Sequence, residues 1–464
     1  MLNEMSTGTP LSVTPRGALD LPVGRAARSD RTSSRRALLA VAGLLVTGAT
    51  IAVGAAHTTA LLPQSVQFVP ASLGGVFDGV GLNLHTGGAI AALGLYFVAY
   101  AFAVSLSAQL SARVVLGAIA VLTLLVLVAP PLVSTDIFSY QAYARMGGLY
   151  GFNPYTHGPY AISFDNALFP YIGEKWSYIP SAYGPVFTVF SYLMAPLAVA
   201  ASVFAYKGIA AVSCLALVAL VWHCARLRGK DPVRAAALVG LNPLLLIYGV
   251  GGGHNDLLML VALVGGLYAV LSSRERIGGG LMVLATGVKL TAGIVLPFAI
   301  LADGRRRGRG RRDLIVGAGI ALALVAILSL AVFGAQSVDM LKTINQSQSE
   351  GDWQTLPGFL GAGLGLVTIS HIVSYALAAI FLVITGHLLR RVWRGDMDWI
   401  DGAGWATLTM LLASSSLLPW YVGWLLPLAA VGHDKRLTRW ALIMTGVVQG
   451  FQLIGYIPHA VGLL

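Results

Sequence analysis

The chain has 464 residues, of which 56% are hydrophobic and only 11% are charged. Soluble domains carry about 25% charged residues, so this composition excludes a water-soluble globular fold, and the high apolar content also excludes a disordered chain. The 30 lysines and arginines outnumber the 19 acidic residues and give a net charge of +11. A few basic charges on an apolar chain are typical of integral membrane proteins. We therefore interpret this excess as a topology signal and not as a nucleic-acid-binding surface.

The first basic residues predict where the N-terminus lies. Several arginines precede the first long apolar run, which begins at residue 37. The positive-inside rule therefore places the N-terminus in the cytoplasm, and residues 1–36 are expected to form a flexible cytoplasmic tail. This leader is long and polar and shows no evident cleavage site, which argues against a secretory signal peptide. Residues 37–464 are predicted to form a single transmembrane domain.

Alternation of apolar runs and basic clusters gives the expected crossings in chain order. A spanning helix needs roughly 20 apolar residues. Two stretches flanked by basic clusters are expected to enter and leave on the same side. Residues 278–302 would form two half-helices that meet near Lys289, and residues 403–431 would turn at Pro419-Trp420-Tyr421. The other predicted crossings are residues 37–60, 88–108, 114–133, 208–225, 233–252, 257–271, 313–335, 367–388 and 440–457. The predicted fold class is all-α, a polytopic transmembrane bundle of roughly 11 to 13 helical segments.

Residues 134–206 are predicted to form a large external loop, because they are rich in aromatic residues, proline and glycine. Residues 186–205 are apolar enough to cross the membrane, but a crossing there would put the basic cluster at residues 226–234 outside. We therefore expect a helix that lies on the outer leaflet. The basic residues expected outside the cytoplasm are only Arg145, Lys175, Lys207, Lys289 and Lys342. Cys214 and Cys224 fall on one helix, too far apart to form a disulfide.

Polar residues gather at the start of the external loop, in residues 134–145. Asp136 follows directly after a predicted crossing, at the outer membrane surface. On a helix, Asp136, Tyr140 and Tyr143 share one face, and Arg145 lies close by. One carboxylate beside tyrosines suits a general base or a site for sugar hydroxyls. The alternative is that Asp136 only caps the N-terminus of the helix.

A second polar group is the run GGGHND at residues 251–256. Its three glycines would let the backbone approach a ligand closely. His254 suits phosphate binding, a hydrogen bond to a sugar hydroxyl, or proton transfer. Asn255 or Asp256 could instead cap the following helix. The run has no spaced histidine or cysteine partners, so no metal site is predicted.

Lys289 stands alone in an apolar stretch. A lysine inside a membrane segment marks a functional site by default, and a phosphate at the outer boundary is a natural partner; the alternative is snorkelling to the interface. Trp420 and Tyr421 could anchor the chain at the interface, stack on a sugar or line a lipid groove, and Tyr183 adds to this aromatic character. Further external acids with no distinguishing context are Asp165, Glu174, Asp339, Glu350 and Asp352.

Taken in this order, the residues resemble the GT-C superfamily of polytopic glycosyltransferases. The resemblance covers about residues 114–430. It rests on Asp136 with the following Ile-Phe-Ser-Tyr, the Tyr-Gly-Pro run at Tyr183, the Gly-Gly-His-Asn-Asp turn, Lys289 and the Pro-Trp-Tyr turn. Within the superfamily the chain looks most similar to the actinobacterial polyprenol-phosphate-mannose-dependent mannosyltransferases.

The resemblance implies a plasma-membrane enzyme that moves a hexose, mannose in the most similar group, from a polyprenyl-phosphate donor to a glycolipid or glycan acceptor on the external face. Asp136 would be the general base of an inverting reaction, and Lys289 with His254 would bind the donor phosphate. No cofactor or metal is expected, because phosphate is already a good leaving group. The residues expected to bind substrate are Tyr140, Tyr143, Arg145, Tyr183, Asn255, Asp256, Trp420 and Tyr421.

Two other classes of function remain open on the sequence. A transporter or flippase for a lipid-linked sugar would also be polytopic and basic inside. Such proteins usually place polar sites near the bilayer midplane and show repeated halves, whereas the polar residues here gather on the predicted external side. A non-catalytic partner of a glycan-assembly complex is the third possibility, for which replacing Asp136 would leave activity intact.

Overall fold

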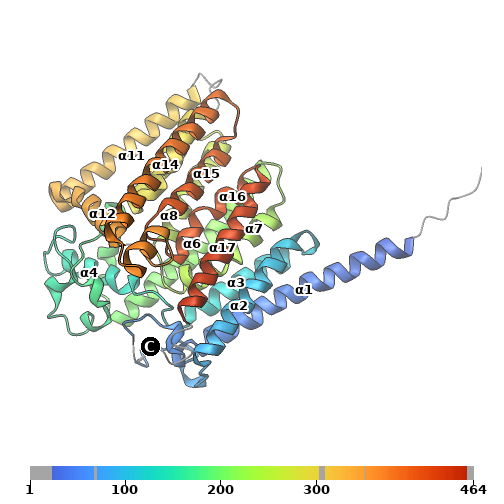
Figure 1. Ribbon diagram of the computed structural model, residues 1–464, viewed down its shortest axis with the longest axis horizontal. Coiled ribbons are helices and arrows are strands. Elements are labelled where there is room, and N and C mark those ends of the chain that lie inside the picture. The colour runs from blue at the N-terminus through green and yellow to red at the C-terminus, as the bar shows by residue number, and fades with distance from the viewer. Residues whose placement is uncertain (1–22, 67–69, 303–308, 351, 457–464) are drawn as a thin grey trace, which may run out of the picture.

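The computed structural model describes residues 23–66, 70–302, 309–350 and 352–456. Across these residues the secondary structure is helical, without a strand, which confirms the all-α prediction. Figure 1 shows long helices packed side by side, with α1 extending away from the bundle. The longer helices are α1 (Val23–Gly54), α2 (His85–Ser105), α3 (Ala112–Val128), α6 (Val199–Leu227), α8 (Asp256–Leu271), α9 (Glu275–Val288), α11 (Arg309–Phe333), α14 (Val367–Arg394), α15 (Trp399–Ala413) and α17 (Lys435–Gly455).

Several of these helices have the length and apolarity of membrane spans. Within the described residues, five are long and apolar enough to cross, and a bent pair, α7 (Pro232–Gly240) with the π-helical turn Leu244–Val250, would make a sixth. Large apolar side chains stay on the outside of these helices; on α14, Leu382 is 66% and Val383 is 72% exposed. Water-soluble proteins rarely expose such continuous apolar faces. These surfaces are therefore the ones that a bilayer would cover, and the chain is a multi-pass membrane protein.

The helix ends that carry basic residues come together at one end of the bundle. The Arg228 guanidinium pairs with Asp398 at 2.9 Å and donates to the carbonyl of Val431 at 3.2 Å. Arg276 pairs with Asp313 at 2.6 Å. The same end holds a cavity of about 460 Å³ lined in part by Ser273, Ala302, Arg311 and Asp396. The ends of α6, α8, α9, α10 (Val295–Leu301), α11, α14 and α15 thus meet as the alternation of basic clusters predicts.

The two stretches expected to turn within the membrane do turn. Helix α9 ends at Val288, Lys289 is extended, and a 3₁₀ turn (Leu290–Ile294) leads into α10. Helix α15 ends at Ala413, and the chain then forms a 3₁₀ turn (Pro419–Trp424) and α16 (Leu426–Val431). Both cysteines are free, as predicted, and both are buried.

The helix bounds differ from the predicted ones at two places. Helix α1 begins at Val23, so the end of the tail drawn at residue 36 falls inside a helix; residues 1–22 lie outside the described part of the chain. Residues 186–205 do not form one surface helix: α5 (Pro185–Ser191) stops before Pro196, and Val199 begins α6. The predicted crossing at residues 233–252 is present as the bent pair, with an angle of 47° between α7 and the π-helical turn; Pro243 lies at this break and lacks the N–H that a continuous helix needs.

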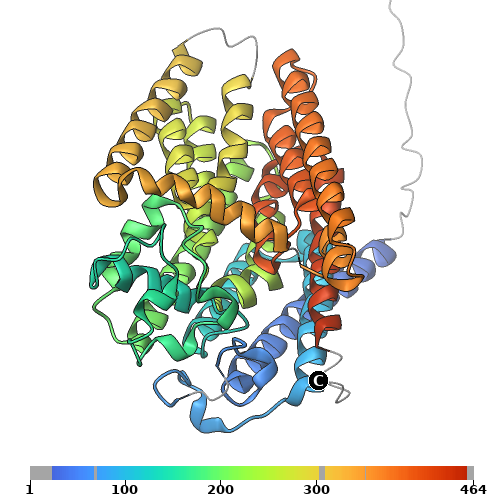
Figure 2. The ribbon, with the colours of Figure 1, turned by 60° about the vertical axis from the view of Figure 1, so that its left-hand side comes forward.

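The external loop folds as a lobe built from α4 (Asp136–Gly148), α5 and short 3₁₀ turns. In Figure 2 this lobe lies at one end of the bundle, with α12 (Met340–Glu350) running across it; α13 (Leu356–Gly358) follows. A buried ion pair organises the lobe: Arg145 of α4 binds Asp165 at 2.6 Å and the carbonyl of Leu197 at 2.9 Å. Only 11% and 6% of these two charged side chains are exposed.

We expect Arg145→Gln to destabilise the protein, because it leaves the buried Asp165 carboxylate without its cation, a loss of about 3–5 kcal/mol. The matched control is Arg276→Gln, which breaks a pair of equal length whose arginine is 63% exposed and should cost less than about 1 kcal/mol. Thermal unfolding in detergent compares the two. An Arg145→Gln protein that unfolds like the wild type but is inactive would contradict this structural role and favour substrate binding by Arg145.

Candidate active site

Asp136 is the first residue of α4, and the segment before it is fastened to the bundle from two sides. Leu132 N–H donates to Gly251 O at 3.0 Å. Lys207, which we had placed outside the membrane, is instead fully buried in α6 and donates to the carbonyl of Pro130 at 2.8 Å and to that of Ala129. The direction in which the chain enters α4 is therefore fixed by contacts from distant parts of the sequence.

The Asp136 carboxylate does not act as a helix cap. Thr135 makes no side-chain cap, and the Asp136 N–H donates to Ser134 Oγ at 3.2 Å. The carboxylate faces His254 instead, with 3.5 Å between Asp136 Oδ2 and His254 Nδ1. Burial raises the pKa of Asp136 to about 6, while Lys289 lowers this pKa and Asp256 raises it by smaller amounts. A carboxylate with a pKa near neutral is well matched to general base catalysis.

His254 lies behind Asp136 and not on an open surface. Its ring stacks on Trp420, with 3.6 Å between the centroids, and its Nδ1 is 3.4 Å from Tyr140 Oη. Burial, with a smaller contribution from Lys289, lowers the pKa of His254 well below its ordinary value, so the ring is neutral. We assign its proton to Nδ1, because that nitrogen faces the carboxylate. In this form the Nδ1–H of His254 faces the Asp136 carboxylate.

The glycines before His254 serve packing. A Cβ on Gly251 would lie 2.7 Å from Leu132 Cδ1, and one on Gly253, where φ is +64°, would lie 2.6 Å from Ile137 Cδ1. The turn can approach α4 this closely only because these residues lack a side chain. The glycines thus bring the turn that carries His254 up to the start of α4, and their predicted approach to a ligand stays a prediction.

Lys289 is not alone, because it pairs with Asp256. Its Nζ donates to both carboxylate oxygens of Asp256 at 2.9 Å, and Trp424 Nε1 donates to Asp256 Oδ1 at 2.6 Å. The ammonium also lies over the Tyr421 ring, 4.7 Å from its centroid. The capping alternative does not hold: the Asp256 carboxylate binds these partners, and Asn255 makes no side-chain cap but accepts from Tyr140 Oη at 3.3 Å.

Three tyrosines pack in a group next to the carboxylate. Tyr183 meets Tyr140 edge to face, with 4.9 Å between the ring centroids, and lies 6.2 Å from Tyr143. The hydroxyl of Tyr143 donates to the carbonyl of Ile179 at 2.8 Å. The shared helix face predicted for Asp136, Tyr140 and Tyr143 thus becomes one side of the site, with Tyr140 buried behind the other two.

These groups surround a cavity of about 330 Å³, a size within the range of small-molecule sites. Its polar part is lined by Asp136, Ser139, Lys175, Lys289, Asp352, Ser414 and Ser416. Its aromatic part is lined by Tyr143, Trp176, Tyr183, Tyr421 and Trp424. An apolar arm extends between α12, α14 and α15 and is lined by Ile344, Ala378, Phe381, Met410 and Leu411.

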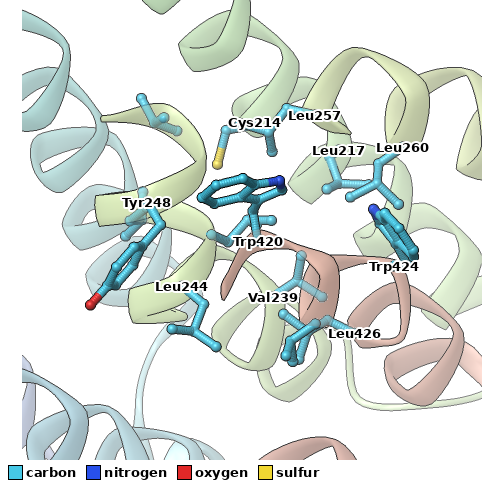
Figure 3. Packing of buried hydrophobic residues seen from close by; sticks show 14 of the residues in the cluster. Cys214, Leu217, Val239, Leu244, Tyr248, Leu257, Leu260, Trp420, Trp424 and Leu426 are labelled. Carbon is cyan, nitrogen blue, oxygen red and sulfur yellow. The ribbon is translucent and has the colours of Figure 1, made fainter. Parts of the chain in front are cut away.

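The structure separates the predicted site residues into three groups. Asp136, Tyr143, Tyr183, Lys289 and Tyr421 line the cavity. A second group lies behind its wall and supports the first: Tyr140, His254, Asn255, Asp256 and Trp420. Figure 3 shows Trp420 within apolar packing near Cys214 and Leu257, so it is no interfacial anchor. Arg145 belongs to neither group, because it pairs with Asp165.

Several residues that line the cavity were not among the predicted site residues, and two of them, Trp424 and Asp352, contact other site residues. Trp424 lies in the same short run as Trp420 and Tyr421, so its aromatic character was a usable signal. No sequence pattern around Asp352 marks it as a site residue. Its distinguishing feature is a contact with a distant residue: Ser416 Oγ donates to Asp352 Oδ2 at 2.6 Å.

Comparison with known proteins shows which family the sequence belongs to. Residues 40–305 match the family model described as alpha-(1->6)-mannopyranosyltransferase, N-terminal domain, and residues 355–453 match the MptB C-terminal domain. The chain belongs to this mannopyranosyltransferase family. Both matched regions line the cavity, the first with Asp136 and Lys289 and the second with Tyr421.

Relatives in this family are similar over much of the chain. The chain is 30% identical to alpha-(1->6)-mannopyranosyltransferase A of Mycobacterium tuberculosis, over 69% of its own length and 68% of the relative's. It is 26% identical to alpha-(1->6)-mannopyranosyltransferase B of Corynebacterium glutamicum, over 66% of its own length and 56% of the relative's. No solved structure matches the chain. The resemblance to actinobacterial GT-C mannosyltransferases is thereby confirmed, and a transporter is not favoured.

A glycine of the Tyr-Gly-Pro run places Tyr183 beside the break at Lys289. Gly184 N–H donates to Val288 O at 3.0 Å. A Cβ on Gly184 would lie only 2.1 Å from Gly287 O and 2.6 Å from its carbonyl carbon. Backbone atoms cannot yield as the end of a flexible side chain can, so this contact requires glycine.

We therefore expect Gly184→Ala to separate the lobe from α9 and to reduce both activity and thermal stability, by about 1–3 kcal/mol in the free energy of unfolding. The matched control is Gly208→Ala in α6, where an added Cβ meets nothing within 4 Å; it should leave both properties near wild type. Thermal unfolding and transfer assays on the two purified variants make the comparison. Equal behaviour of the two would show that the contact is unimportant.

Proposed function

We propose that this protein is an inverting glycosyltransferase that moves mannose from a polyprenyl-phosphate donor to a glycolipid or glycan acceptor, and that the cavity is its active site. One observation carries the proposal: the Asp136 carboxylate, the Lys289 ammonium and an apolar arm all belong to the same cavity. The chain that forms this cavity is a member of the mannopyranosyltransferase family. Each of the three suits one part of the reaction.

Asp136 is the proposed general base. The acceptor hydroxyl oxygen attacks the anomeric carbon and forms the new glycosidic bond while Asp136 takes the hydroxyl proton. The bond from the anomeric carbon to the phosphate oxygen breaks at the same time, and the phosphate leaves with its electron pair. His254 supports this role by holding the carboxylate from behind, 3.5 Å away. We no longer assign phosphate binding to His254, because its ring is fully buried and neutral.

Lys289 is the proposed partner of the donor phosphate. An ammonium group has three N–H donors, and two of those on Lys289 bind Asp256. The third N–H of Lys289 can bind a ligand in the cavity, because 12% of the Lys289 side chain is exposed. A bond from this donor would stabilise the charge that develops on the leaving phosphate. Asp256 therefore acts by positioning Lys289.

The apolar arm favours a lipid-linked donor over a soluble nucleotide sugar. Phe381 and Ala378 belong to α14, whose outer face is highly exposed and would lie against lipid. A polyprenyl chain could therefore pass from the bilayer into the arm and leave its phosphate next to Lys289. The sequence also has no nucleotide-phosphate motif of the P-loop or G-x-G-x-x-G type on the predicted cytoplasmic side.

The orientation of the bundle supports an external active site. Helices α8, α9 and α15 each run between the cavity and the basic end: α9, for example, starts at Glu275 beside Arg276 and ends next to Lys289. Since basic ends face the cytoplasm, the cavity would face outward and the N-terminus inward. A flippase would instead be expected to place polar groups along a path through the membrane.

Asp136→Asn tests the proposal directly. The amide keeps the size of the side chain but cannot accept the proton, so we expect kcat to fall by about 10²–10⁴-fold while thermal unfolding stays unchanged. The assay uses purified protein with polyprenyl-phosphate mannose and a panel of mannosyl acceptors, read by mass spectrometry. The control is Asp339→Asn, which removes a carboxylate from a surface pair with Lys342. Near-normal transfer by Asp136→Asn would reject the base assignment.

The pH dependence gives a second test. Asp136 acts as a base only when ionised, so kcat/KM should fall as the pH drops through its pKa of about 6 and level off above it. Hydrogen bonding from Tyr183 lowers the pKa of Asp136, so Tyr183→Phe should move the midpoint of the profile to higher pH. Initial rates between pH 4.5 and 8.5 give both midpoints. A wild-type midpoint near 4, the ordinary range of an aspartate, would contradict the buried environment.

A further inference from the structure

The cavity holds a carboxylate that the proposed reaction does not use. Asp352 lies in the turn between α12 and α13 and lines the same cavity as Asp136 and Lys289. Burial raises the pKa of the Tyr421 hydroxyl, and the carboxylates of Asp256, Asp136 and Asp352 raise this pKa further. Asp352 therefore belongs to the polar part of the cavity and not to the outer surface.

The backbone around Asp352 is built to hold it in place. Asp352 N–H donates to Ser415 O at 2.8 Å, and Thr355 Oγ1 donates to the same carbonyl at 2.9 Å. A Cβ on Gly358 would lie 2.0 Å from Asp352 O, so the turn closes as tightly as a backbone can. These contacts clamp the turn onto the chain between α15 and the Pro-Trp-Tyr turn.

The carboxylate itself is oriented through one of its oxygens. Asp352 Oδ2 accepts from Ser416 Oγ at 2.6 Å and from Leu417 N–H at 3.1 Å. A carboxylate offers about four acceptor positions, so these two bonds use about half of its capacity. The other acceptor positions of Asp352 are therefore on a charged side chain that is held in one orientation and lines the cavity.

The surroundings of Asp352 indicate what it would accept from. A negative charge on this wall disfavours a phosphate and favours groups that donate hydrogen bonds. Ser414 and Ser416 line the cavity on the same chain segment, and Tyr421 and Trp176 add aromatic rings. Rings that enclose a ligand, with a few polar groups that fix its orientation, describe a small-molecule subsite. Hydroxyl groups bind carboxylates through short, charge-assisted bonds, and a pyranose ring presents several of them.

We propose that Asp352 binds hydroxyl groups of a mannose ring in the cavity, with Ser416 orienting its Oδ2. This inference rests on the proposed function and deepens it, because it adds a sugar-binding residue to the base and the phosphate partner. The mannose is either the one being transferred or the terminal one of the acceptor. The chemistry of recognition is the same in both cases, and kinetics with each substrate varied in turn tells them apart.

The test is Asp352→Asn in the full-length protein. The amide oxygen can still accept from Ser416 and Leu417, so the clamp is kept and only the charge is lost. We expect the KM for one substrate to rise by at least about tenfold, the size expected for one hydrogen bond to a charged group. A rise for polyprenyl-phosphate mannose assigns Asp352 to the transferred sugar, and a rise for the mannosyl acceptor assigns it to the acceptor. Thermal unfolding should not change.

Ser416→Ala separates sugar binding from a purely structural clamp. It removes one bond to Asp352 but leaves the charge, so we expect a smaller rise in KM than for Asp352→Asn. Asp339→Asn is the matched control and should leave both KM values unchanged. The inference is overturned if neither KM of Asp352→Asn changes by more than about twofold, or if Ser416→Ala reproduces the full effect. Wild-type protein that transfers no mannose would instead reject the proposed function itself.

Discussion

The ion pair between Lys289 and Asp256 is the interaction on which the rest of the site depends. Burying two charges costs more than their attraction returns unless the geometry is good and the remaining polar atoms are satisfied. Here two bonds of 2.9 Å join the charges, and Trp424 donates a third to the carboxylate. The pair ties the start of α8 to the break after α9 and to the C-terminal turn. It also places one positive charge where it lowers the pKa of Asp136.

The site residues fall into those that the sequence revealed and those that it did not. Asp136 and Lys289 stood out because a charge in an apolar chain is costly and therefore conspicuous. Their partners were not predictable, because each lies more than thirty residues away along the chain. The sequence therefore predicted a phosphate as the partner of Lys289 and substrate binding by Asp256, but it did not show that the two side chains pair with each other. Asp352 was passed over for the same reason, since its partner Ser416 is equally remote.

The fold shows a similar division. Composition and the positions of basic residues predicted an all-α bundle whose charged helix ends meet, because both follow from the cost of placing charge in lipid. Local breaks were predicted less well: the stretches 186–205 and 233–252 are interrupted near Pro196 and Pro243. The arginines before residue 37 predict on which side of the membrane the segment lies, but they do not predict its conformation. The sequence therefore offered no reason to begin α1 as early as Val23. A helix can extend beyond the bilayer as readily as a flexible tail.

The position of the cavity follows from where the helices are interrupted. In lipid, irregular backbone is tolerated only where protein buries it or where it lines a cavity. The chain is irregular before Asp136, at the turn that carries His254, at Lys289 and between Ala413 and Pro419. Each backbone N–H or C=O group that is not bonded within a helix then needs a hydrogen-bond partner from another interrupted segment. Gly184 N–H, for example, donates to Val288 O, and Leu132 N–H donates to Gly251 O. Interrupted segments whose backbone groups form hydrogen bonds with one another must lie next to one another. The same requirement that keeps the backbone hydrogen-bonded therefore gathers Asp136, Lys289 and Asp352 around one cavity.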